Sequence, residues 1–138
     1  MTFEYTVPGD DFTRAGEASS SIKKTLKQIG IAPDIIRRVA IAVYEGEINM
    51  VIHANGGKIN IEVTSDDIKM TLTDKGPGIA DIALAMREGW STAPEDVRSL
   101  GFGAGMGLPN MKSYTDEMTL ESTVGVGTTV RMLVHVKP

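Results

Sequence analysis

Residues 44–54 read YEGEINMVIHA and combine an apolar helical pattern with three polar residues spaced four apart. At about 100° per residue, Glu45, Asn49 and His53 lie along one side of a helix. Glu47 points roughly 200° away from Glu45, so we expect it on a solvated side of that helix. Glu45 and Asn49 either aim into a pocket or form the polar margin of an ordinary amphipathic helix. For His53, a packed or capping residue near the helix end is favoured over a pocket residue.

The segments around this stretch predict the remaining elements. Proline and aspartate at 33–34 suit a first helical turn and Asn-Gly-Gly at 55–57 suits a helix end, which predicts a helix over 33–54. β-prone and amphipathic segments predict a strand over 3–7, a helix over 12–29, a hairpin of 58–64 with 68–73, a helix over 108–114, and a hairpin of 117–123 with 128–136. The glycine-rich residues 74–107 read as a lid. This order predicts an α+β fold, a two-layer sandwich of a mostly antiparallel sheet with helices on one face.

The composition excludes several classes of protein. The chain has 138 residues, with 14 Lys and Arg against 18 Asp and Glu for a net charge of −4, and it has no cysteine. Its length suits one domain, which we expect over 1–138. No basic block favours nucleic acid or anionic lipid, and disulfides and thiolate zinc sites are excluded. Without a signal peptide or an apolar run near the roughly 18 residues that span a bilayer, we expect a cytoplasmic protein with no membrane partner.

Two glycine-containing motifs suggest a ligand. DKGPGI at 74–79 directly follows a predicted strand, and the Asp74 carboxylate can accept a hydrogen bond from an exocyclic amine such as that of adenine. GFGAGMGL at 101–108 runs into a helix, and its exposed amides and helix N-terminus suit phosphates. A plain surface turn explains the first motif equally well, and a flexible loop without a ligand explains the second. The order of elements excludes a dinucleotide fold, and no P-loop motif is present.

Together and in this order, the motifs resemble those of the GHKL, or Bergerat-fold, ATP-binding domains of gyrase, Hsp90, MutL, histidine kinases and anti-sigma serine kinases. The resemblance rests on four segments: Glu45-x-x-x-Asn49-x-x-x-His53-Ala54 for the N box, Asp74-x-Gly76-x-Gly78 for the G1 box, Gly103-x-Gly105-Met106-Gly107-Leu108 for the G2 box, and Gly127-Thr128-Thr129-Val130 for the closing Gly-Thr element. About 32 residues precede the N-box helix and only a strand follows the last motif, so we expect neither the dimerisation helix of histidine kinases nor a transducer domain. The chain is therefore most similar to the anti-sigma factor and serine/threonine kinase family of bacterial partner switching.

The resemblance implies a role for each matched residue. Asn49 would hold Mg²⁺ against the triphosphate of ATP, Asp74 would bind the adenine amino group, and Glu45 would take the proton from the acceptor serine. ATP would also contact His53, Gly76, Gly78, Gly103, Gly105, Met106, Gly107, Leu108 and, on the adenine side, Thr129.

The sequence departs from the family pattern at two points. Gly46 occupies a position where alanine is common, at a cost to helix stability of roughly 1 kcal/mol. The lid offers only Arg87 and Arg98 as candidate partners of the γ-phosphate.

The function that the resemblance implies is an ATP- and Mg²⁺-dependent serine/threonine protein kinase. Its substrate would be a STAS-domain anti-anti-sigma protein, it would also bind a sigma factor or another effector, and it would form a homodimer through its first strand and helix. Two alternatives stay open: a nucleotide-sensing partner switch without catalysis, and a stand-alone histidine-kinase-like ATPase domain. A related fold that binds no nucleotide is a third.

Overall fold

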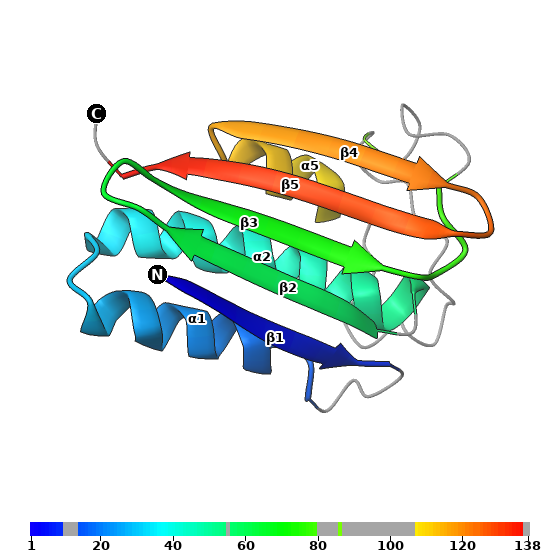
Figure 1. Cartoon of the computed structure of the whole chain (residues 1–138), viewed down its shortest axis with the longest axis horizontal. Coiled ribbons are helices and arrows are strands. Elements are labelled where there is room, and N and C mark those ends of the chain that lie inside the picture. The colour runs from blue at the N-terminus through cyan, green and yellow to red at the C-terminus, as the bar shows by residue number, and fades with distance from the viewer. Residues whose placement is uncertain (10–13, 55, 80–85, 87–106, 137–138) are drawn as a thin grey trace.

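The computed structural model describes residues 1–9, 14–54, 56–79, 86 and 107–136 (Figure 1). In chain order the elements are β1 (Thr2–Pro8), α1 (Glu17–Gln28), α2 (Pro33–His53), β2 (Gly56–Val63), β3 (Asp67–Asp74), α5 (Gly107–Ser113), β4 (Glu117–Thr123) and β5 (Gly127–His135). Each predicted strand and helix is present. The first helix begins at Glu17, later than the predicted start at residue 12, after a turn over residues 14–16. Most of the predicted lid lies outside the described residues.

The five strands form one antiparallel sheet in the order β1-β2-β3-β5-β4. β2 with β3 and β4 with β5 are the predicted hairpins, and β3 and β5 join them in the middle of the sheet. The β3–β5 register runs from Asp67 opposite His135 to Asp74 opposite Thr128. The end of β3 therefore lies beside the start of β5.

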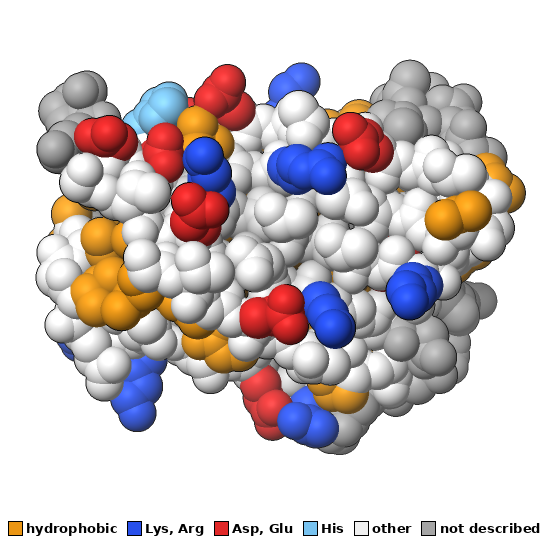
Figure 2. Space-filling model, in the orientation of Figure 1, with side chains coloured by type: hydrophobic (Ala, Val, Ile, Leu, Met, Phe, Trp, Pro, Cys, Tyr) orange, Lys and Arg blue, Asp and Glu red, His pale blue; other side chains and the backbone are white. Residues whose placement is uncertain are grey.

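The three helices of the described residues lie on one face of the sheet, as expected for an α+β sandwich (Figure 1). Alternate strand residues point into this layer, and Ile59, Ile61, Ile68 and Met70 are fully buried there. The opposite face carries polar and charged side chains, among them the pair Arg131 and Glu121 at 3.2 Å (Figure 2). The core is thus a single layer between sheet and helices.

Gly46 owes its place in α2 to close packing on the sheet. A Cβ at this position would collide with the Leu72 Cδ2 atom of β3 and come within 3.2 Å of Met111 Cε of α5. Leu72 and Met111 are themselves buried, so neither can move freely. The glycine gives up helix propensity and allows α2 to approach β3 closely.

Both ends of the described chain are fixed at the β2–β3 turn. The amino group of Met1 donates to the Val63 carbonyl at 3.1 Å, and the N–H of Val136 donates to the Asp66 carbonyl at 2.9 Å. This turn lies at the opposite end of β3 from Asp74 (Figure 1). Among the described helices, none is long and apolar enough to cross a membrane.

Candidate functional site

Glu45 and Asn49 lie one turn apart in the second half of α2, and both are partly buried. The Nδ2 atom of Asn110, on α5, donates to Glu45 Oε1 at 3.4 Å. Because α5 starts at Gly107, the last glycine of the glycine-rich motif, this contact links α2 to the helix in which that motif ends. Sequence reasoning missed Asn110, since nothing in the pattern indicates which face of α5 meets α2. The side chain of His53 lies outside what the structure describes.

Glu47 is not on a solvated side of α2, and that prediction was wrong. Its side chain is buried, with only 2% of the residue exposed. Oε2 accepts the N–H groups of Gly16 and Ala18 at 3.0 and 3.1 Å, and Oε1 accepts the N–H of Ser19 at 3.1 Å. These donors are the unpaired amides at the start of α1, where Gly16 provides no side-chain cap. A carboxylate from α2 therefore caps α1 and suits the positive end of its dipole.

Asp74 closes β3 on the helix side of the sheet. Its Oδ1 atom accepts two backbone hydrogen bonds, from Gly76 at 2.9 Å and from Thr128 at 3.2 Å. Within the described residues, no hydrogen bond to Oδ2 is present. Two amide donors on one oxygen fix the orientation of the carboxylate, so the second oxygen is directed as an acceptor.

The loop after Asp74 is shaped by its two glycines. A Cβ on Gly76 would lie 2.7 Å from Ala54 Cα, and a Cβ on Gly78, whose φ is +78°, would meet the carbonyl oxygen of Thr123. Only glycine fits both places. The loop is also bonded to the β4–β5 hairpin, because Gly125 N–H donates to the Pro77 carbonyl at 2.8 Å. It is therefore a fixed structural part of the site.

Thr128, and not Thr129, lies with Asp74. The two threonines are neighbours in β5, so their side chains point to opposite faces of the sheet. Thr128 is buried on the helix side, and its Oγ1 lies 2.8 Å from Ser122 Oγ, which in turn accepts the Ile79 N–H at 2.6 Å. Thr129 pairs with Thr73 on the open face. The structure thus does not bring Thr129 to the other candidate residues.

The glycine-rich motif is described only at its end. Gly107 begins α5, and Leu108 is partly buried against the core. Gly103, Gly105 and Met106 lie outside the described residues, as do the two lid arginines, Arg87 and Arg98.

The donor set near the end of β3 suits a nucleotide. Asp74 offers an acceptor beside two glycines. A Cβ on Gly57 would lie 3.2 Å from Asp74 Cβ, and a Cβ on Gly76 would lie 3.2 Å from Asp74 Oδ1, so a side chain at either position would fill the space around the carboxylate. Within the described residues, no three histidine, cysteine or acidic side chains gather as metal ligands. Asn49 carries an amide oxygen, and Mg²⁺ takes few protein ligands when phosphates supply the others. The residues therefore fit ATP with Mg²⁺.

A second polar network lies at the other end of α5 and stabilises the fold. Asp116 accepts the His135 N–H at 2.7 Å and pairs with Arg38 of α2 at 3.2 Å. Arg38 also donates to the Tyr114 carbonyl at 3.2 Å. The backbone hydrogen bond from His135, together with Arg38, lowers the pKa of Asp116 below its usual 3.8 although burial opposes the shift. These bonds fix the connection from α5 to β4.

Comparisons with known proteins agree with this geometry. Residues 10–134 match the model of the histidine kinase-like ATPase domain. The chain is 32% identical over 115 residues to the serine/threonine-protein kinase RsbT of Bacillus subtilis, covering 80% of each, and 31% identical over 124 residues to the anti-sigma F factor of the same species, covering 86% of this chain and 82% of that one.

Two solved structures share the fold. One contains the RsbU and RsbW domains of a Mycobacterium tuberculosis protein, with a TM-score of 0.66, 13% identity, and coverage of 97% of this chain and 32% of that one. The other is the mycobacterial sensor histidine kinase MprB, with a TM-score of 0.56, 14% identity, and coverage of 98% and 97%.

Proposed function

The chain belongs to the histidine kinase-like ATPase (GHKL) family, and on that premise we propose that it is an ATP- and Mg²⁺-dependent serine/threonine protein kinase of the anti-sigma factor type. Its proposed substrate is a STAS-domain anti-anti-sigma protein, and its proposed setting is cytoplasmic partner switching with a sigma factor or another effector. The kinase assignment is supported by the relative whose printed name is a serine/threonine-protein kinase, and the partner class by the anti-sigma F factors.

We assign the base of the nucleotide to the end of β3. The oriented Oδ2 of Asp74 would accept a hydrogen from the adenine amino group, and Thr128 takes the place that the sequence alone suggested for Thr129. This exchange is supported by the position of Thr128, whose N–H already holds Asp74 at 3.2 Å. Gly76 and Gly78 would let the base lie against the backbone.

We assign the chemistry to the neighbouring face of α2. The acceptor serine oxygen forms a bond to the γ-phosphorus while the bond from that phosphorus to the β–γ bridging oxygen breaks, and ADP leaves with the electron pair. Glu45 takes the serine proton, and the Asn110 amide holds the carboxylate toward α5. Asn49 would be the protein ligand of Mg²⁺, which neutralises phosphate charge when bound.

The observation that carries the proposal is the position of Glu45: one turn from Asn49 on α2 and 3.4 Å from Asn110 on the helix that follows the glycine-rich motif. A carboxylate placed there lies near the proposed metal ligand and contacts the helix that begins at the last glycine of the proposed phosphate-binding motif. If Glu45 only belonged to the polar margin of a solvated helix face, it would have no partner such as Asn110 on a second helix.

The test is phosphoryl transfer from γ-labelled ATP with Mg²⁺ to STAS-domain proteins of the same genome, with Glu45→Gln in parallel. We expect label on a serine with the wild type, and the same ATP affinity but at least about a hundredfold less transfer with Glu45→Gln. Glu17→Gln removes the same charge from the exposed start of α1 and serves as the control. Unchanged transfer by Glu45→Gln would remove this residue from the role of base.

The same experiment separates the alternatives. ATP binding and acceptor binding without label would select a nucleotide-sensing switch. ATP hydrolysis without a labelled acceptor would select an ATPase domain, and a flat calorimetric titration with Mg·ATP would refute nucleotide binding altogether.

A further inference from the structure

Ser122 joins three segments of the chain through one hydroxyl group. It lies near the end of β4, at the edge of the sheet, and is partly buried on the helix side. Its Oγ atom accepts the N–H of Ile79 at 2.6 Å, donates to the Gly127 carbonyl at 3.3 Å, and lies 2.8 Å from Oγ1 of Thr128. The loop after β3, the start of β5 and the end of β4 therefore meet at this side chain.

The hydroxyl group of Ser122 is used completely by these neighbours. It has one proton and two lone pairs. The Ile79 N–H can only donate and the Gly127 carbonyl can only accept, so the Thr128 hydroxyl donates into the second lone pair. Among aliphatic side chains, only those of serine and threonine accept and donate in this way through a single atom. Removal of the hydroxyl would leave an amide and a second hydroxyl without this partner.

The bonds of Ser122 complete a ring around Asp74. Oδ1 of Asp74 accepts the N–H of Thr128 at 3.2 Å and that of Gly76 at 2.9 Å. Ser122 links these two donors, since it bonds Thr128 on one side and the N–H of Ile79, in the same loop as Gly76, on the other. In the sheet register, Thr128 lies opposite both Asp74 and Ser122. The orientation of the carboxylate therefore depends on Ser122 through Thr128 and the loop.

A separate bond keeps the loop attached to the hairpin. The N–H of Gly125 donates to the Pro77 carbonyl at 2.8 Å. This contact is between backbone atoms, so a changed side chain at residue 122 does not remove it. Loss of the Ser122 hydroxyl should therefore shift the positions of the ring atoms while the fold remains.

We propose that Ser122 is a positioning residue for the base of the nucleotide, which holds the Thr128 hydroxyl and the Asp74 carboxylate where adenine requires them. The proposal rests on the proposed function, and in particular on the assignment of the base to the end of β3. A hydrogen bond weakens steeply when it is bent, so the free oxygen of Asp74 has to be directed along the N–H bond of the adenine amino group. Ser122 thus acts on recognition of the base, apart from the chemistry proposed for Glu45.

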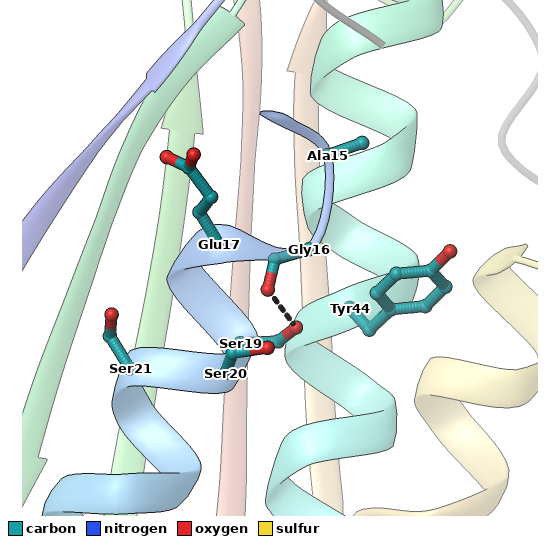
Figure 3. Close-up of a pocket in the computed structure, with 7 residues that line it drawn as sticks. All are labelled: Ala15, Gly16, Glu17, Ser19, Ser20, Ser21 and Tyr44. Atoms are coloured by element: carbon teal, nitrogen blue, oxygen red, sulfur yellow. Dashed lines mark hydrogen bonds between the residues drawn. The ribbon is translucent and has the colours of Figure 1, made fainter. Parts of the chain in front are cut away.

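Ser19 of α1 shows what a purely structural serine hydroxyl does. Ser19 is buried, and its hydroxyl donates to the Gly16 carbonyl at 3.0 Å within the first turn of the helix (Figure 3). That bond serves one turn of one helix, whereas the bonds of Ser122 join three segments. Ser19→Ala therefore removes a serine hydroxyl without changing the ring around Asp74, and it serves as the control.

The experiment compares two nucleotides by calorimetry, with Mg²⁺ present. ATP carries the 6-amino group, and purine riboside triphosphate lacks it, so the ratio of their affinities reports the contact of that group with Asp74. A variant that only destabilises the fold weakens the binding of both nucleotides alike and leaves this ratio unchanged.

Ser122→Val and Ser122→Thr have nearly the same shape and differ in the hydroxyl group. We expect Ser122→Val to weaken ATP binding by about three- to tenfold and to lower the ratio by about threefold. Ser122→Thr keeps a hydroxyl and should stay within about twofold of the wild type in both quantities. Ser19→Ala should leave the ratio unchanged.

Phosphoryl transfer gives a second readout. We expect Ser122→Val to raise the KM for ATP while kcat stays within about twofold of the wild type, because the contact with the base is the same in the ground state and the transition state. A fall in kcat with an unchanged KM would assign Ser122 to the chemical step and overturn the positioning role.

The remaining outcomes separate this proposal from the proposed function. A wild-type ratio in Ser122→Val would refute the role of Ser122, and equal losses in Ser122→Val and Ser122→Thr would assign the effect to shape and not to the hydroxyl. Both results leave the kinase assignment intact. Equal binding of the two nucleotides by the wild type would refute the contact of Asp74 with the amino group and the role of Ser122 with it. Binding of neither nucleotide would refute the proposed function itself.

Discussion

Replacing Glu47 should destabilise the protein more than any other change of a single carboxylate described above. Its two oxygens accept three backbone N–H groups of α1, and the residue is 2% exposed, so water cannot replace the lost acceptor without opening the contact between α1 and α2. Each unpaired buried amide costs about 1 kcal/mol or more. Glu47→Ala should therefore lower the free energy of unfolding by about 3 kcal/mol, within the upper range for loss of a helix cap combined with a small cavity.

The matched variant is Glu47→Gln, which keeps the shape of the side chain. If its amide oxygen replaces Oε2, the contacts to Gly16 and Ala18 survive, but the amide nitrogen then faces the N–H of Ser19. We expect a loss of about 2 kcal/mol for this variant, since one hydrogen bond becomes a contact between two donors.

The assay is denaturant unfolding followed by circular dichroism, with thermal unfolding as a second measure. A loss of about 3 kcal/mol corresponds to a fall in Tm of about 10 °C for a chain of this size. Glu17→Gln, an exposed change in the same first turn, should alter stability by only a few tenths of a kcal/mol. If Glu47→Gln and Glu17→Gln are equally stable, Glu47 is not the cap of α1, and the reasoning fails.

Three other predictions follow from contacts already described. Gly46→Ala should improve helix propensity yet lower stability by about 1 kcal/mol, because a Cβ collides with the packed sheet; a gain in urea unfolding would show that the core adapts. Thr128→Val should weaken ATP binding in calorimetry by about tenfold while Thr129→Val leaves it unchanged, and the reverse ranking would return the adenine role to Thr129. The lowered pKa of Asp116 means that its carboxylate stabilises the fold above pH 3.8 and loses this effect as the pH falls through its folded-state value. The free energy of unfolding of the wild type should therefore fall more steeply than that of Asp116→Asn below about pH 5, and parallel curves would refute this contribution.

Local sequence signals predicted the elements because each signal acts within a few residues. Pro33 fixes the start of α2, Gly30 with φ +84° follows the end of α1, and alternation of apolar residues marks each strand. The hairpins follow from turn residues at 65–67 and 125–127. The start of α1 was misplaced because its cap is supplied from α2, so no capping residue in its own sequence marks Glu17.

In the candidate site too, local patterns predicted some positions correctly, whereas positions that depend on contacts between elements were missed. Spacing correctly placed Glu45 and Asn49 on one side of α2, but the helical wheel assigned Glu47 to solvent, because the wheel does not reveal that the amides of another helix lie there. Strand alternation separated Thr128 from Thr129, yet only the β3–β5 register decides which one faces Asp74. The contact of Asn110 with Glu45 likewise depends on how α5 docks, which no local pattern records.

The two ends of the described chain, which meet at the β2–β3 turn, offer a route for protein engineering. Residues 1 and 136 bond residues 63 and 66 of the same turn, at the opposite end of β3 from Asp74. A short linker could join them to make a circular permutant, with new termini opened in the connection between α1 and α2 at residues 29–32, whose exposed residues lie outside the candidate site. Reporter proteins or surface tethers attached at residues 1 or 136 would likewise lie away from Asp74, so labelled forms should report on ligand binding at the proposed site without blocking it.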